Sequence, residues 1–246
     1  APSPSKAPAP DKGRGFRTLG WGSIAVPCSW QVADYQQGAA AAGTPVIDLP
    51  IYANYRYPFA GDAASLASFP VPRDNNPVGS YQVEFTIPEA WDGRRIFLVL
   101  EGAESNATVW IDGRKVGYSQ DSRLPAEFDV TAACAGPSRG APLAAVGDAA
   151  SQPKVAGPHV LSVQCMRYCD GSYLEDQDHW WLSGLHRHVW LYAKPHRLAL
   201  VDYHVVTTAV QPEASSPPAG PSAEMTISVR CQSDRRLAPS ELESYR

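Results

Sequence analysis

Apolar and polar side chains alternate in many short segments of this chain. In Ser80–Ile87 every second residue is apolar, a pattern that places these side chains on one face of a β-strand. Arg95–Leu100 is apolar almost throughout, which is typical of a strand buried on both faces. The same reasoning predicts strands over Trp21–Val26, Ile51–Tyr57, Ala107–Ile111, Lys115–Tyr118, Glu127–Val130, His159–Tyr168, His188–Tyr192, Leu198–Thr208 and Glu224–Cys231.

The turns between these segments support the same fold class. Asp112 and Gly113 separate two predicted strands, and an Asp-Gly pair at this position is a strong signal for a two-residue hairpin. No segment has a convincing helical period. Many short strands with turns and no helix predict an all-β fold, built as a β-sandwich or jelly roll.

Three low-complexity stretches interrupt the strand pattern. Residues 1–18 are rich in Pro, Ala, Lys and Gly, and we expect a disordered tail there. The stretches near 36–47 and 134–158 are rich in Ala and Gly, the second also in Pro and Ser. We expect both to be surface insertions in one domain that spans residues 19–196.

The composition changes near Lys194 and Pro195. Residues 197–246 contain two or three predicted strands, which are too few to bury a core of their own. We therefore expect an incomplete second β-domain in this range. The chain does not begin with Met and has no visible signal peptide, so we expect it to be a piece of a longer chain.

Composition limits the classes of partner. The 246 residues are 44% hydrophobic and carry a net charge of −4 without a Lys/Arg-rich run, so nucleic acid and membrane surfaces are not expected partners. No apolar run reaches the roughly 18 residues of a membrane span. The five cysteines are scattered, which favours free thiols in a reducing compartment, and we expect a cytoplasmic protein.

The segment Asp170–Trp190 holds most of the candidate chemistry. It contains the carboxylates of Glu175, Asp176 and Asp178, together with three indoles and three imidazoles. Carboxylates accept hydrogen bonds from sugar hydroxyls, and indoles cover the apolar face of a sugar ring. The segment therefore suits a sugar platform, although an acidic turn above core tryptophans explains the same composition.

Five stretches of the chain carry a resemblance to a known family: Val26–Gln31, Pro50–Phe59, Asn76–Tyr81, Asp112–Asp129 and Asp170–Asp178. They are similar to the N-terminal sugar-binding domain of glycoside hydrolase family 2, in particular the large bacterial-type β-galactosidases. The last two stretches are long and specific. The resemblance spans residues 21 to about 208.

The resemblance implies a jelly-roll β-sandwich, then an immunoglobulin-like domain, then a catalytic barrel. It also implies retaining hydrolysis of terminal β-D-galactose residues by two glutamates on the barrel, Mg²⁺ held elsewhere in the full-length enzyme, and a homo-oligomer. The chain departs from the family pattern: an early Leu-Asn-Gly-Trp strand is missing, two insertions are present, and the chain ends inside the second domain. We therefore expect no catalytic residue in this chain and no hydrolysis by it alone.

Two positions match the family's sugar pocket. Asn54 falls where the family reaches the galactose, and an amide both donates to and accepts from hydroxyls. Asp178 falls where the family supplies a carboxylate to galactose and to a sodium ion, which takes oxygen ligands. The alternatives are that Asn54 satisfies backbone groups at a strand end, and that Asp178 pairs with Arg187 or caps a turn.

The remaining polar and aromatic residues are expected to be structural. Arg123 and Glu127 should hold their loop by an internal salt bridge or backbone bonds. Trp180 and Trp181 line the pocket floor or belong to the core, as large aromatics in sandwiches usually do. A self-contained pair of acids is not expected at Glu175 to Asp178, because acids on one short loop do not bracket a sugar from two sides.

Zinc and glycan sites are also not expected. His179, His186 and His188 have spacing that suits a metal only weakly. The sequon at Asn106 leads directly into a predicted strand, and we expect it to be unused.

Three functions compete at this level. The first is the N-terminal part of a β-galactosidase, which shapes a galactose and sodium pocket. The second is a stand-alone carbohydrate-binding module or lectin that uses the Asp178 segment and its tryptophans. The third is an inert structural sandwich. Activity gained when the missing barrel is supplied would favour the first.

Overall fold

The computed structural model describes residues 22–36, 48–54, 57–59, 70–135, 157–196, 198–210 and 222–233. The chain divides into two compact units, Ala1–Ala193 and Lys194–Arg246. The predicted tail at 1–18, and all but the edges of the predicted insertions, lie outside the described residues.

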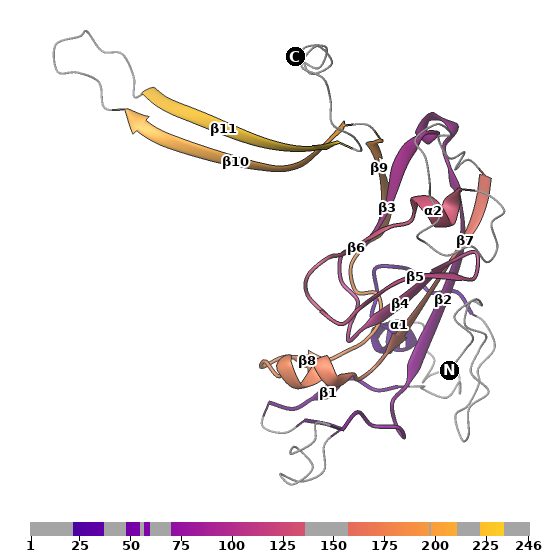
Figure 1. Cartoon of the computed structure of the whole chain (residues 1–246). Helices are drawn as coiled ribbons and strands as arrows, with labels where there is room; N and C mark the ends of the chain where they lie inside the picture. The colour runs from indigo at the N-terminus through magenta and orange to yellow at the C-terminus, as the bar shows by residue number, and fades with distance from the viewer. Residues whose placement is uncertain are drawn as a thin grey trace. The chain divides into compact units, whose positions relative to one another are not determined.

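The two larger sheets of the first unit (Figure 1) contribute the side chains of one core. Strand order in the first sheet is β2-β7-β4-β5, and in the second it is β6-β3-β9. The first sheet consists of β2 (Val78–Ile87), β7 (Gly157–Met166), β4 (Ala107–Ile111) and β5 (Arg114–Ser119). The second consists of β6 (Ala126–Asp129), β3 (Arg94–Leu100) and β9 (Val189–Pro195).

Both sheets contribute the apolar side chains that their alternation predicted. β3 is buried from Ile96 to Leu100, as its continuous apolar run indicated. On β4 and β7, Val109 and Val163 are almost fully buried and lie opposite each other in the ladder. Burial of apolar side chains between two sheets is the main driving force for this fold. The all-β prediction is confirmed, and the two sheets form a β-sandwich.

The predicted hairpin turn is also confirmed. Ile111 pairs with Arg114 across the β4·β5 hairpin. The two residues between them, Asp112 and Gly113, have φ values of 50° and 78°. Positive φ at both central residues defines a type I′ turn, whose twist matches that of the strands it joins.

One predicted strand is absent from the structure, and another is shorter than predicted. Residues 22–26 form no strand, because an apolar segment without a neighbouring strand makes no ladder. Of Ile51–Tyr57 only β1 (Ile51–Tyr52) is a strand, and it pairs with β8 (Trp180–Trp181). β1 and β8 together are called the rim ribbon below.

The sequence also gave no hint of several short helices. These are α1 (Trp30–Gln36), α2 (Thr131–Cys134) and the 3₁₀ helices Glu89–Trp91 and Asp170–Leu174. None is longer than two turns, so none could produce a helical period that stands out from its surroundings. Within the described ranges, no helix is long and apolar enough to cross a membrane.

The described part of the second unit is an antiparallel pair of strands, β10 (Leu198–Val210) and β11 (Ser222–Ser233). A register irregularity between Leu200 and Asp202 keeps apolar residues of both strands on one face. The immunoglobulin-like fold of this unit stays a prediction.

Candidate functional site

The two predicted sugar-contacting residues flank the same end of the rim ribbon. Ile51 pairs with Trp181 and Tyr52 with Trp180. The ladder ends at the Tyr52 and Trp180 pair, and Asn54 follows this pair by two residues in one segment while Asp178 precedes it by two in the other. Both residues are exposed. Segments that are far apart in the sequence therefore place an exposed amide and an exposed carboxylate beside one end of the ribbon.

Asp178 accepts a hydrogen bond from the Tyr52 hydroxyl. This bond raises the pKa of Tyr52 above its ordinary value, so the phenol stays protonated and keeps donating. Trp180 lies next to Tyr52 with ring centroids 5.6 Å apart and is 56% exposed. The end of the ribbon thus combines a carboxylate with two exposed aromatic rings.

The alternative structural roles of Asn54 and Asp178 are not seen among the described residues. Among the described residues, Asn54 makes no side-chain hydrogen bond to a strand end, and no ion pair joins Asp178 to Arg187. The Arg187 guanidinium instead donates to the Arg123 carbonyl at 2.7 Å. Asn54 and Asp178 therefore keep hydrogen-bonding capacity that faces solvent.

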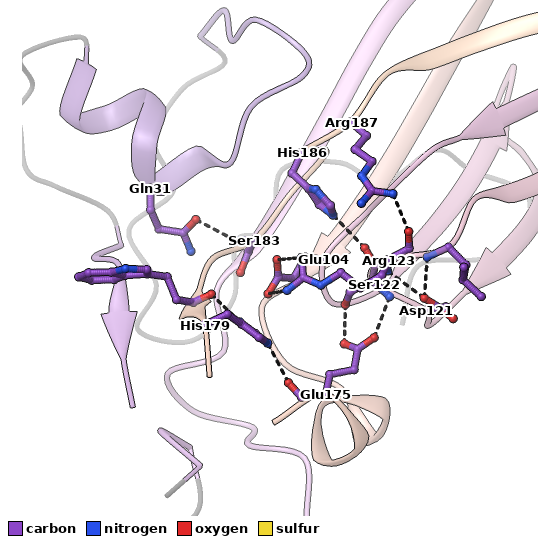
Figure 2. A network of polar contacts seen from close by, with 12 residues as sticks. Gln31, Glu104, Asp121, Ser122, Arg123, Glu175, His179, Ser183, His186 and Arg187 are labelled. Carbon is purple, nitrogen blue, oxygen red and sulfur yellow. Dashed lines mark hydrogen bonds and ion pairs between the residues drawn. The ribbon is translucent and has the colours of Figure 1, made fainter. Parts of the chain in front are cut away.

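A network of polar contacts fixes the segment that leads to Asp178 (Figure 2). The Glu175 carboxylate accepts from the Ser122 amide at 2.8 Å and from its hydroxyl at 2.5 Å. The His179 ring nitrogens lie 3.1 Å from the Glu175 carbonyl and 2.9 Å from the Trp180 carbonyl. Glu175 is therefore occupied by the neighbouring loop, while Asp178 is held by Tyr52, and the two acids do not act as one cluster.

Of the two predicted ways in which Arg123 and Glu127 hold their loop, an internal salt bridge or backbone bonds, the salt bridge between the two is not formed. Arg123 pairs with Glu104, at 3.2 Å, and Glu127 accepts from the Tyr192 hydroxyl at 2.5 Å. The loop around Arg123 is shaped instead by Asp121, which accepts from two backbone amides. Glu127 lies on β6 whereas Arg123 belongs to the loop before this strand, so the two side chains need not face each other.

Behind the exposed end lies a pocket of about 310 Å³. Glu104 and His186 are among the residues that line it. Burial raises the pKa of Glu104, against the lowering effect of Arg123. Burial also lowers the pKa of His186, whose Nε2 lies 2.8 Å from the Ser122 carbonyl. No signal in the sequence marked Glu104.

The two adjacent tryptophans have opposite environments. Trp181 is 4% exposed and donates to the Ala53 carbonyl at 3.3 Å, so it belongs to the core. Trp180 is exposed and borders the pocket. Alternation along β8 separates them, a signal that a two-residue strand makes hard to detect in sequence.

Sequence reasoning also missed a buried ion pair next to the rim ribbon. The Asp48 carboxylate pairs with Arg167 and accepts from Trp30 Nε1 at 2.8 Å and Gln31 Nε2 at 2.7 Å. Asp48 and Arg167 are 7% and 5% exposed. An arginine that follows a long apolar strand was the one available signal for such a pair.

The environments of the cysteines and of the glycosylation sequon at Asn106 are those of structural residues. All five cysteines are free, and Cys134, Cys165 and Cys169 are buried. Among the described residues no group of three or more His, Cys, Asp or Glu is arranged to hold a metal ion. Asn106 is buried and accepts from the Met166 amide at 3.2 Å, which leaves no room for a glycan.

Carboxylates and amides bind sugar hydroxyls, and an exposed indole can cover the apolar face of a sugar ring. The family model described as "Glycosyl hydrolases family 2, sugar binding domain" matches residues 19–141 and 148–195. The chain belongs to this family.

Individual relatives carry the name β-galactosidase. The chain is 38% identical over 199 residues to "Beta-galactosidase" of Psychromonas ingrahamii, covering 81% of this chain and 15% of that protein. It is 41% identical over 182 residues to "Beta-galactosidase" of Vibrio vulnificus strain YJ016, covering 73% and 14%. The chain thus spans about 15% of the length of these relatives. A solved β-glucuronidase of Bifidobacterium dentium has a TM-score of 0.43 and 21% identity, over 63% of this chain and 27% of that chain.

Proposed function

We propose that this chain is the N-terminal part of a β-galactosidase that hydrolyses terminal β-D-galactose residues with retention of configuration. In this proposal Asn54 and Asp178 contribute to the galactose pocket, while both catalytic glutamates lie on a barrel outside these residues. The single observation that supports the proposed pocket is the pairing of Tyr52 with Trp180, because Asn54 and Asp178 each lie two residues beyond this pair and are exposed.

The chemistry of this end suits a galactose unit. Asn54 offers a donor and an acceptor to sugar hydroxyls, and the Asp178 carboxylate offers acceptors only. The exposed ring of Trp180 can cover apolar C–H groups of the sugar. The second carboxylate oxygen of Asp178 can serve as one ligand of a sodium ion. The other sodium ligands, and those of Mg²⁺, would come from outside the described residues, in a homo-oligomer of the longer protein.

A stand-alone carbohydrate-binding module is the second candidate. One observation favours it: Trp180 and Tyr52 form an exposed aromatic pair next to Asp178. Such a surface can hold a sugar without a barrel. This candidate predicts saturable galactose binding by the chain alone that is as strong as binding to the complete enzyme, whereas the first predicts weak binding and no hydrolysis.

A chimera tests the first candidate. Residues 19–195 replace the matching segment of the Psychromonas ingrahamii β-galactosidase, and kcat/KM is measured with a chromogenic β-galactoside. We expect an active chimera. Asp178→Asn should lower kcat/KM at least about tenfold, because a charged hydrogen bond is worth about 1.5–3 kcal/mol, and should abolish the activation by sodium. Asn54→Ala should lower kcat/KM by a similar factor.

The matched control is Asp176→Asn, an exposed acid two residues away that should leave kcat/KM unchanged. Equal activity of the Asp178 and Asp176 variants would contradict the pocket assignment. Hydrolysis by the unfused chain, lost in Asp178→Ala, would contradict the location of the catalytic groups on a separate barrel.

A further inference from the structure

A groove of about 760 Å³ opens beside the strands at which the two larger sheets end. β2 is the last strand of one sheet and β9 is the last strand of the other, and residues of both strands line the groove. The core residues Leu98, Leu161 and Val163 line it as well. The groove therefore reaches the apolar interior between the two sheets.

The exposure of Val83 shows that the sandwich is open here. Val83 and Ile87 lie on the same face of β2, because side chains alternate along a strand and four residues separate the two. Ile87 is 1% exposed and belongs to the core, whereas Val83 lines the groove and is 55% exposed. An apolar side chain on the inner face of a sandwich normally packs against the opposite sheet. At Val83 the described residues leave half of the side chain uncovered.

The free edges of β2 and β9 favour a strand as the occupant of the groove. In the described sheets each of them has a neighbour on one side only, β7 for β2 and β3 for β9. A strand at the edge of a sheet presents unpaired N–H and C=O groups. Residues 22–24 border the groove without forming a strand. An extended peptide can pair with such an edge and insert every second side chain into an adjoining pocket.

Volume and charge define the chemistry of this peptide. A cavity of about 150 Å³ holds a group the size of benzene, so a groove of about 760 Å³ holds about five side chains. β2 is 10 residues long, and a neighbour of that length places about five side chains on one face. Among the described residues that line the groove there is no Asp, Glu, Lys or Arg. The inserted side chains should therefore be apolar.

We propose that the groove binds an extended peptide segment from outside this chain, with large apolar residues at every second position, which completes the sandwich as an added strand. The stretch 1–18 does not offer this pattern, because Phe16 is its one large apolar residue. The inference does not depend on the proposed function, since neither Asn54 nor Asp178 lines the groove.

The full chain can be tested with a fluorescent ten-residue peptide that has Trp, Leu, Val, Phe and Val at alternate positions and Lys or Thr between them. Fluorescence anisotropy measures the Kd. We expect saturable binding, with a Kd at least about tenfold lower than that of a peptide with the same residues in an order without alternation. Methylation of the backbone nitrogen at every second residue removes the donors of one peptide edge. At least one of the two possible methylation patterns should raise the Kd about tenfold.

A variant of the groove complements these peptides. Val83→Asp places a charge among apolar side chains and should raise the Kd at least about tenfold. Thr86→Asp is the matched control, because Thr86 is an exposed residue of the same strand that does not line the groove, and it should leave the Kd unchanged. The peptide should also raise the Tm of the wild type, because it binds only the folded state. The methylated peptides act on the wild type, so the test stands even if Val83→Asp misfolds.

Four results would overturn the inference. Equal affinity for the alternating and the reordered peptide would show a non-specific apolar surface, and equal Kd values for Val83→Asp and Thr86→Asp would place the peptide elsewhere. Absence of binding by a chain that sediments as a dimer would assign the groove to a second copy. Absence of binding by a monomer would mean that the chain itself occupies the groove.

Discussion

Each strand of the rim ribbon is preceded by an aspartate, and the two aspartates have opposite environments. Asp48 is buried, pairs with Arg167 and accepts from two further side chains. Asp178 is exposed and accepts from one tyrosine hydroxyl. A carboxylate whose acceptor positions are filled inside the protein supports the fold, whereas one with open positions facing solvent is available to a ligand.

The strongest test of this comparison is Asp48→Ala. The substitution leaves the Arg167 guanidinium buried without its partner and removes the acceptor of Trp30 and Gln31. Breaking a buried ion pair in this way costs about 3–5 kcal/mol. We expect the free energy of unfolding, measured by urea denaturation followed by tryptophan fluorescence, to fall by about this amount.

Asp202→Ala is the matched control, because Asp202 forms an exposed ion pair with Arg230 at 3.3 Å. Exposed pairs contribute about 0–1 kcal/mol. Should the midpoint of Asp48→Ala shift no more than that of Asp202→Ala, the buried pair would not be the structural group that its environment indicates.

The environments of these residues also explain which parts of the fold and of the site could be predicted from the sequence. Alternation identified the strands of both sheets and the Asp112-Gly113 hairpin, because these depend on neighbours in the sequence. The partners of Asp48 and Glu104 come from distant segments, so no local pattern identified them. Family motifs, not local chemistry, pointed to Asn54 and Asp178, and their shared position depends on a two-residue strand pair that alternation could not locate.

A pH dependence offers a smaller test, on the polar network that contains His186, Ser122 and Glu175. Burial lowers the pKa of His186, while the unfolded chain binds this proton near pH 6.5. Between the two pKa values the unfolded state holds more protons, so stability rises with pH. The contribution is complete above pH 6.5 and is lost as the pH falls towards the folded pKa. The stability of the wild type should therefore decrease when the pH is lowered from 7.5 to 5.5.

His186→Gln should show less of this decrease, whereas His188→Gln, whose side chain is 73% exposed, should behave like the wild type. The difference between variants is the useful quantity, because burial raises the pKa of Glu104 and this carboxyl contributes the opposite slope. Parallel pH profiles for all three proteins would show that the buried imidazole is not the group that titrates.

The smallest expected effect on stability belongs to Asp178. Asp178→Asn keeps an acceptor for Tyr52 and changes an exposed side chain, and such substitutions usually alter stability by less than about 0.5 kcal/mol. For a chain of this size that is a shift of at most about 2 °C in Tm, measurable by circular dichroism. A fall of several degrees would assign Asp178 to the structural class of Asp48. An unchanged Tm, combined with lost activity in the chimera, would show that Asp178 at one end of the ribbon serves binding, whereas Asp48 at the other end serves folding.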